Sequence, residues 1–196
     1  MSFGSKAVNN YALLLILLAA TLCSSQGFAE QAYPQRIITL SPHLAELVIT
    51  LGAGERLVGV IEHSDFPQQA QMLPRVGSAS GLDMERIITL APDLVIAWQG
   101  GTRGVDISKL KRLGFRVVSI KSENIDDIPR SIELLGDLLG QQRKAVSLVS
   151  EYHHRIEKLS QDYSVLPKQS VFIEISSLPL MGLTDKHSLG SGLRLC

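Results

Sequence analysis

Short apolar segments alternate with amphipathic ones along the chain, and this alternation constrains the fold more than any other sequence feature. Short, nearly continuous apolar runs suit strands that are buried on both faces. Such strands alternating with helices predict an α/β lobe, a mostly parallel sheet with helices on both faces. The predicted order is strand Arg36–Leu40, helix Pro42–Leu51, strand Arg56–Val60, helix Asp83–Leu90, strand Asp93–Ala97, helix Val105–Leu113 and strand Arg116–Ile120.

The pentapeptide Arg-Ile-Ile-Thr-Leu occurs twice, at Arg36–Leu40 and Arg86–Leu90, and its surroundings predict a different structure for each copy. Ser41-Pro42 follows the first copy and supplies a helix N-cap and a proline suited to the first turn, so this copy is expected to be a strand. Asp83 precedes the second copy and can cap a helix that contains it. Because the sequence beyond the two copies does not match, no repeat architecture is expected.

The first part of the chain predicts an export signal. A lysine precedes the apolar stretch Tyr11–Leu22, and Gly-Phe-Ala at 27–29 offers small residues at a cleavage site. This stretch is shorter than the ~20 apolar residues of a membrane-spanning helix. We therefore expect residues 1–29 to be a cleaved signal peptide. Lipid attachment at Cys23 is not expected, because a leucine rather than a small residue precedes it.

Composition and motifs argue against two large classes of function. The chain has 19 basic and 19 acidic side chains, so its formal charge of zero predicts no nucleic-acid partner. It has no Gly-x-Ser-x-Gly elbow, phosphate loop or dinucleotide fingerprint, so an exported hydrolase is only an alternative. No histidine spacing indicates a metal site, and we expect no resident cofactor. His43 and His63, which each follow a strand, stay open as ligands of a metal or haem.

Two further helices are expected, at Ile128–Gly140 and Gln141–Tyr163. The second would be ~35 Å long. Either it is a strut between two lobes or it covers the first lobe, and its periodicity fits both. Ser170–Ile175 then predicts a new strand. The apolar side of the long helix is expected to carry Val146, Val149, Tyr152, Ile156, Leu159 and Tyr163.

Three segments carry a family resemblance: R-I-I-T-L-S-P-H-L-A-E, S-D-F-P and G-L-D-M-E-R-I-I-T-L-A-P-D-L-V-I-A-W. They resemble the periplasmic substrate-binding proteins of iron-siderophore and cobalamin ABC importers, most strongly over Asp83–Trp98. The resemblance implies a class III fold, in which one long helix joins two α/β lobes that hold the ligand between them. It divides the chain into an N-terminal lobe at 30–127, a helical linker at 128–166 and the start of a second lobe at 167–196. It also implies a periplasmic monomer.

Within that family, S-D-F-P and A-W-Q-G-G are most similar to the cobalamin-binding branch. The resemblance implies that the ligand is cobalamin or a related corrinoid, since flat aromatic walls suit a broad, partly apolar plate. Ala79 stands where that branch can carry another aromatic, so an iron-siderophore or haem ligand is the alternative. The implied ligand-binding residues are Ser41, Pro42, Phe66, Trp98 and Gly100.

The same resemblance implies an ABC permease as the partner. Acidic residues on each lobe are thought to meet arginines of the permease, and Glu85, in an exposed first helical turn, is the candidate here. The alternative is a solvated residue that stabilises its helix by about 0.3–1 kcal/mol. Since the sequence ends soon after the expected start of the second lobe, we expect that lobe to be truncated. This chain alone is then expected to bind ligand weakly or not at all.

Overall fold

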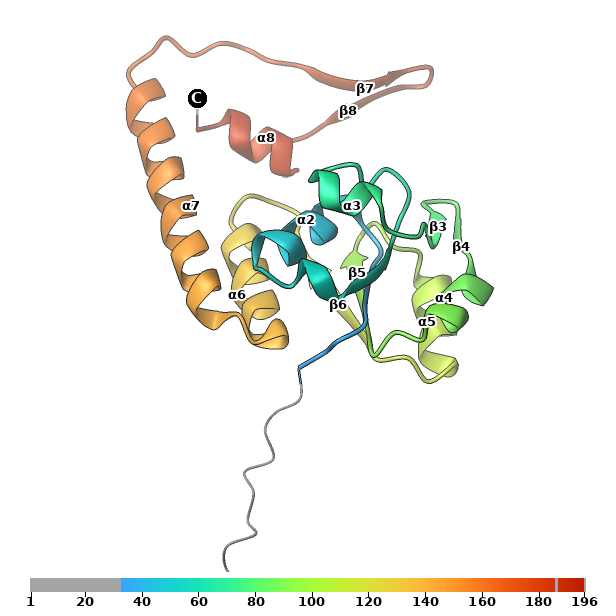
Figure 1. Ribbon diagram of the computed structural model, residues 1–196. Coiled ribbons are helices and arrows are strands. Elements are labelled where there is room, and N and C mark those ends of the chain that lie inside the picture. Colours follow the sequence, from blue (N-terminus) through green and yellow to red (C-terminus); the bar gives the residue numbers. More distant parts are fainter. Residues whose placement is uncertain (1–32, 186, 196) are drawn as a thin grey trace, which may run out of the picture. The chain divides into compact units, whose positions relative to one another are not determined.

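A four-stranded parallel sheet is the centre of the computed structural model, which describes residues 33–185 and 187–195 (Figure 1). The strand order is β2-β1-β5-β6. Ile37 of β1 pairs with Leu57 of β2 and with Leu94 of β5, so β1 lies between them. The predicted parallel sheet is therefore confirmed. The strands are β1 at Ile37–Thr39, β2 at Leu57–Val60, β5 at Leu94–Gln99 and β6 at Val117–Lys121.

Helices cover both faces of this sheet, as predicted. On one face, α2 (Pro42–Thr50) and α6 (Asp127–Leu139) pack against Ile37 and its neighbours. On the other, α4 (Met84–Leu90) and α5 (Gly104–Arg112) pack against Ile38. Adjacent residues of a strand point to opposite faces, so β1 contributes to both cores. The helices bury Leu44, Val48, Leu135 and Leu139 on the first face and Ile87 and Leu110 on the second.

The two identical pentapeptides adopt the different structures that their surroundings predict. The first forms β1, and the second forms most of α4, where a carboxylate oxygen of Asp83 accepts the backbone N–H of Arg86 at 2.9 Å. The copies also meet, because Nη2 of Arg36 donates to the carbonyl oxygen of Leu90 at 2.6 Å. This contact satisfies a carbonyl at the end of α4 that has no partner within the helix.

The capping role expected for Ser41 is only partly correct. Ser41 occupies the N-cap position of α2, but its side chain makes no capping hydrogen bond. Its hydroxyl lies 2.6 Å from Nδ1 of His43 instead. A capping serine accepts a backbone N–H through its hydroxyl oxygen, whereas here the hydroxyl is engaged by the neighbouring imidazole.

The long helix α7 (Gln142–Tyr163) covers α6 with its first half only. Ala145 is its one buried residue, and a Cβ on Gly136 of α6 would lie 2.4 Å from the Ala145 Cβ. This close approach turns Val146 to solvent, where it is 67% exposed, so its predicted place on the apolar side is wrong. Beyond Tyr152 the helix has no buried residue, which fits a strut better than a cover.

The chain continues with an antiparallel hairpin, β7 (Ile173–Ser177) and β8 (Leu180–Leu183), and the short helix α8 (Ser188–Leu193). The strand expected from Ser170 thus begins at Ile173. No helix within the described residues is long and apolar enough to cross a membrane. The predicted signal peptide at 1–29, Cys23 and Cys196 lie outside the described residues. Short elements that the sequence did not predict are η2 at Gly54–Arg56, α3 at Gln68–Gln71, β3 at Gly77–Ser78 and β4 at Gly81–Leu82.

Replacing Asp83 by alanine tests whether the cap fixes the helical copy of the pentapeptide. We expect Asp83→Ala to lower the free energy of unfolding, measured in urea, by about 1 kcal/mol, because the Arg86 N–H loses its acceptor. Asp126→Ala is the matched control, since Asp126 is also an N-cap aspartate but makes no side-chain capping bond. Equal losses in the two variants would show that the capping hydrogen bond contributes nothing.

Candidate functional site

The sheet has a topological switch point between β1 and β5. From β1 the chain first adds β2 on one side, and it later adds β5 and β6 on the other side. In open α/β sheets, ligands bind outside the carboxyl ends of the strands where the order reverses in this way. Ser41 follows β1, and Trp98 lies near the end of β5. The topology therefore brings the ends of these two strands to one crevice.

Two cavities lie at this edge of the sheet, and Trp98 borders both. The larger has a volume of about 760 Å³, with His43 and Leu47 of α2, Gly100 after β5 and Ile128 of α6 in its walls. His187, at the N-cap of α8, also borders it. The smaller cavity, of about 240 Å³, is lined by residues that include Ser41, Pro42, His63, Ala79, Arg103 and Asp106.

The indole of Trp98 is held in place from three directions. It lies over Gly101, where an added Cβ would come 1.8 Å from Cε3 of the indole, so only glycine fits beneath it. The hydroxyl of Thr102 accepts the backbone N–H of Trp98 at 3.0 Å. The ring of His43 meets the indole edge to face, with centroids 5.1 Å apart and planes at 89°.

One polar atom of this tryptophan has no partner. Nε1 of Trp98 is buried, and no described residue accepts its hydrogen. An indole N–H that is buried usually finds an acceptor. Trp98 thus combines a broad apolar ring with a buried donor that has no acceptor among the described residues.

The surroundings of His43 disfavour the charged form of its imidazole. Burial lowers the pKa of His43 below its ordinary value of 6.5. Ser41, which is 2% exposed, is the one hydrogen-bond partner of His43 among the described residues. In the smaller cavity Arg103 and Asp106 form an ion pair at 3.5 Å. No group of three or more histidines, cysteines or acidic residues in 33–185 and 187–195 could hold a metal ion.

The structure brings together four of the five residues expected to bind ligand. Ser41 and Pro42 line the smaller cavity, Gly100 lines the larger, and Trp98 lines both. Phe66 is 67% exposed and borders neither cavity, so it does not share a wall with Trp98. Its position in a loop before α3 could not be read from the S-D-F-P segment.

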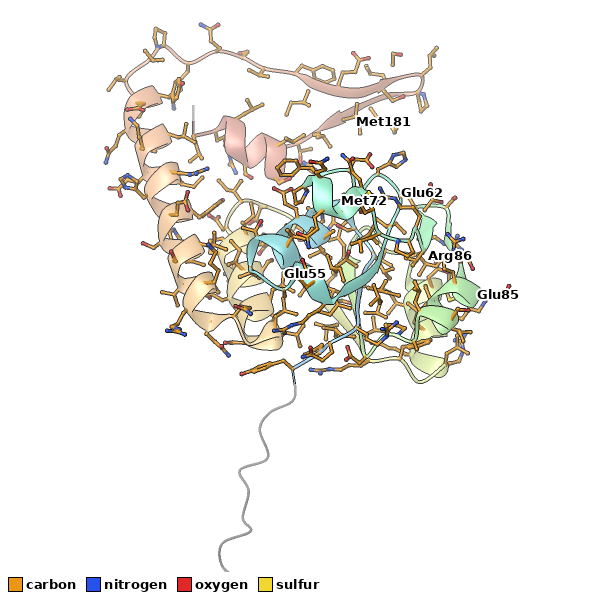
Figure 2. All side chains as sticks on the ribbon, in the orientation of Figure 1. Glu55, Glu62, Met72, Glu85, Arg86 and Met181 are labelled. Carbon is orange, nitrogen blue, oxygen red and sulfur yellow. The ribbon has the colours of Figure 1, made fainter. Side chains whose placement is uncertain are left out.

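Other features of the site were not predicted from the sequence. The sequence assigned no role to Gly101 or Arg103, and the Gly100-Gly101 pair is the local signal that could have indicated close packing against Trp98. Glu85 lies on α4 and borders neither cavity, and Figure 2 shows it beside Arg86 at the edge of the view. The predicted docking residue is therefore separate from the crevice.

A methyl group beneath the indole tests the support of Trp98. We expect Gly101→Ala to displace the ring and shift the emission maximum of Trp98, which is the only tryptophan in the chain. Gly104→Ala is the matched control, because nothing lies within 4 Å of the position that its Cβ would take. An unchanged emission spectrum in Gly101→Ala would contradict the close packing of indole and glycine.

Comparisons with known proteins agree with the α/β fold of the chain. The model of the periplasmic binding protein family matches residues 37–190. The vitamin B12-binding protein of Vibrio vulnificus (strain CMCP6) is 32% identical over 184 residues, which cover 93% of this chain and 64% of that protein. The chain thus spans less than two thirds of the length of this relative.

Solved structures give the same result for the fold. The periplasmic vitamin B12-binding protein of Vibrio cholerae matches with a TM-score of 0.76 and 32% identity, over 83% of this chain and 64% of that one. A periplasmic haem-binding protein from Pseudomonas aeruginosa matches with a TM-score of 0.66 and 27% identity, over 72% and 52% of the two chains. The chain belongs to the periplasmic binding protein family, whose members are non-enzymatic binding components of transport.

Proposed function

We propose that this chain is the part of a periplasmic binding protein that captures cobalamin or a related corrinoid and delivers it to an ABC permease. The observation that carries the proposal is the position of Trp98, which borders a cavity of about 760 Å³ at the switch point of the sheet. Such a volume lies within the range of roughly 300–1,000 Å³ found for small-molecule sites. A cleaved signal at residues 1–29 would account for export.

The chemistry of the walls supports a flat ligand with polar groups at its fringe. Trp98 and Leu47 supply apolar area, while polar side chains such as Gln99 border the same cavity. Corrin rings carry amide side chains around a broad plate, so one ligand can use both features. The similarity to the vitamin B12-binding proteins of Vibrio vulnificus and Vibrio cholerae supports this choice among flat ligands.

Haem is the second candidate, and specific observations favour it. Ala79 rather than an aromatic lines the smaller cavity, and two histidines, His43 and His187, border the larger one. The structural relative from Pseudomonas aeruginosa is described as haem-binding. An iron-siderophore complex is supported by the broader family resemblance.

The C-terminal hairpin supports the proposal of a second lobe after the linker α7. Several of its apolar side chains are exposed, among them Phe172 at 68%, Ile175 at 56% and Leu180 at 67%. Figure 2 labels another, Met181, on β8. A two-stranded sheet is at best marginally stable alone and needs further strands or a helix against an apolar face. We propose that 167–196 is the first part of such a lobe.

Quenching of Trp98 fluorescence by cyanocobalamin tests the proposed ligand. We expect saturable quenching as cyanocobalamin is added, because Trp98 borders the proposed site and is the only tryptophan. N-acetyltryptophanamide corrects for absorption by the ligand. The resemblance implies that a second lobe forms the opposite wall, so a dissociation constant weaker than about 1 μM is expected for this chain. Quenching no greater than that of the free tryptophan analogue would refute the proposal.

Two variants locate the binding surface in the same experiment. Equilibrium dialysis of the coloured ligand should show about 30-fold weaker binding by Trp98→Ala, a loss of about 2 kcal/mol that is typical of a central aromatic contact. Phe66→Ala should cost less, because Phe66 borders neither cavity. A larger loss in Phe66→Ala would place the ligand elsewhere.

We also propose that Glu85 docks on an arginine of the permease. Glu85 is exposed in the first turn of α4, and its carboxylate forms no ion pair with any described residue. The neighbouring Arg86 is instead engaged, donating to the carbonyl oxygen of Arg75 at 2.9 Å. An unpaired carboxylate outside the crevice can meet a cation without disturbing the ligand.

Charge reversal tests this docking proposal. We expect Glu85→Arg to reduce cobalamin uptake by cells that carry the importer with its binding protein, because like charges then face each other. Ligand affinity should not change, since Glu85 borders neither cavity. Glu133→Arg, a reversal at an exposed position of α6, is the control. Normal uptake with Glu85→Arg would exclude the contact.

A further inference from the structure

We infer that His43 is an axial ligand of the metal at the centre of the bound macrocycle, and that Ser41 is the positioning residue for its ring. The inference rests on the proposed function, and it defines the ligand class more narrowly as a metal-centred flat macrocycle with an exchangeable axial site. Corrinoids and haem share this chemistry. The macrocycle supplies its own equatorial ligands, so a single imidazole is sufficient.

The right angle between His43 and Trp98 is the first support. A macrocycle that stacks on the face of Trp98 lies parallel to the indole. The donor lone pair of an imidazole lies in the plane of its ring, so an axial imidazole stands perpendicular to the macrocycle. The two side-chain rings are at 89° with centroids 5.1 Å apart. The right angle between the rings is therefore the one that an axial imidazole needs beside a macrocycle stacked on Trp98, and both residues border the larger cavity.

The contact between Ser41 and His43 is the second support. The hydroxyl of Ser41 lies 2.6 Å from Nδ1 and 3.3 Å from Nε2, so it lies beside the ring, within reach of both nitrogens. This contact holds the orientation of the ring, and in the tautomer with the proton on Nδ1 the lone pair is on Nε2. Neighbouring groups commonly orient a metal-bound histidine in this way.

The other histidines at this edge are less suited to the role. His187 borders the same cavity, but its Nδ1 accepts the backbone N–H of Leu189 at 3.3 Å. The lone pair of its Nδ1 is therefore already engaged by the backbone. His63 lines the smaller cavity. Of these three histidines, His43 alone borders the larger cavity and makes an edge-to-face contact with Trp98.

The step needs no oxidant and no net proton transfer. With aquocobalamin, Nε2 forms a bond to cobalt while the cobalt–water bond breaks, and water leaves as a neutral molecule. Cyanocobalamin keeps its tightly held cyanide, so His43 cannot replace it. The protein should therefore prefer aquocobalamin to cyanocobalamin by about tenfold or more.

Absorption spectra of the bound ligands test the inference. We expect the visible bands of aquocobalamin to shift on binding as they do with free imidazole, while those of cyanocobalamin keep their positions. His43→Ala should lose the shift and bring the two affinities close together, whereas the control His63→Ala should keep both. Ferric haem is the second probe, and a His43-dependent low-spin spectrum with haem alone would identify haem as the ligand.

Ser41 variants separate positioning from simple packing. Ser41→Ala should lower the ratio of aquocobalamin to cyanocobalamin affinity, and Ser41→Thr, which restores the hydroxyl, should recover it. The axial ligand would be overturned if both cobalamins bound with equal affinity and unshifted bands and haem showed no His43-dependent spectrum. The proposed function would still stand after that result. A shift that persists in His43→Ala would also overturn the axial ligand. No binding of either cobalamin or haem would refute the proposed function and this inference together.

Discussion

The burial of β1 on both faces is the constraint on which the rest of the structure depends. Ile37, Ile38 and Thr39 are all completely buried, and each of the two hydrophobic cores includes one of the isoleucines. A strand in this position must have neighbours on both sides, and here they are β2 and β5. The order of strands therefore reverses beside β1, and this reversal opens the crevice that Trp98 borders. The site is thus a consequence of how the central strand is buried.

Most of the lobe could be predicted because its signals are local. Asp83, Gly114 and Gly140 mark helix ends, and both glycines have the positive φ that such ends favour. The position of Val146 could not be predicted, because it depends on the close approach of α6 and α7 at Gly136 and Ala145. Periodicity indicates that α7 has an apolar side. Which of its residues meet α6 is decided by the small side chains where the two helices approach, Gly136 and Ala145.

The site was less accessible from the sequence than the fold. The place of Trp98 followed from the strand that precedes it, whereas its contact with His43 joins residues 55 positions apart (98 − 43) and has no local signal. The resemblance groups Phe66 with Trp98 as a ligand-binding aromatic, yet Phe66 is exposed and borders neither cavity. Residue type was therefore a weaker guide to the crevice than the topology of the sheet.

The contact between Arg36 and Leu90 has a consequence for how the two identical pentapeptides can change. In the first copy the arginine binds a carbonyl at the end of a helix, whereas in the second Arg86 donates to the carbonyl oxygen of Arg75. The same substitution would then remove unrelated interactions at the two places. Identity over five residues therefore does not mean that a substitution has the same effect in both copies. An average of mutational effects over identical pentapeptides would combine two different structural roles.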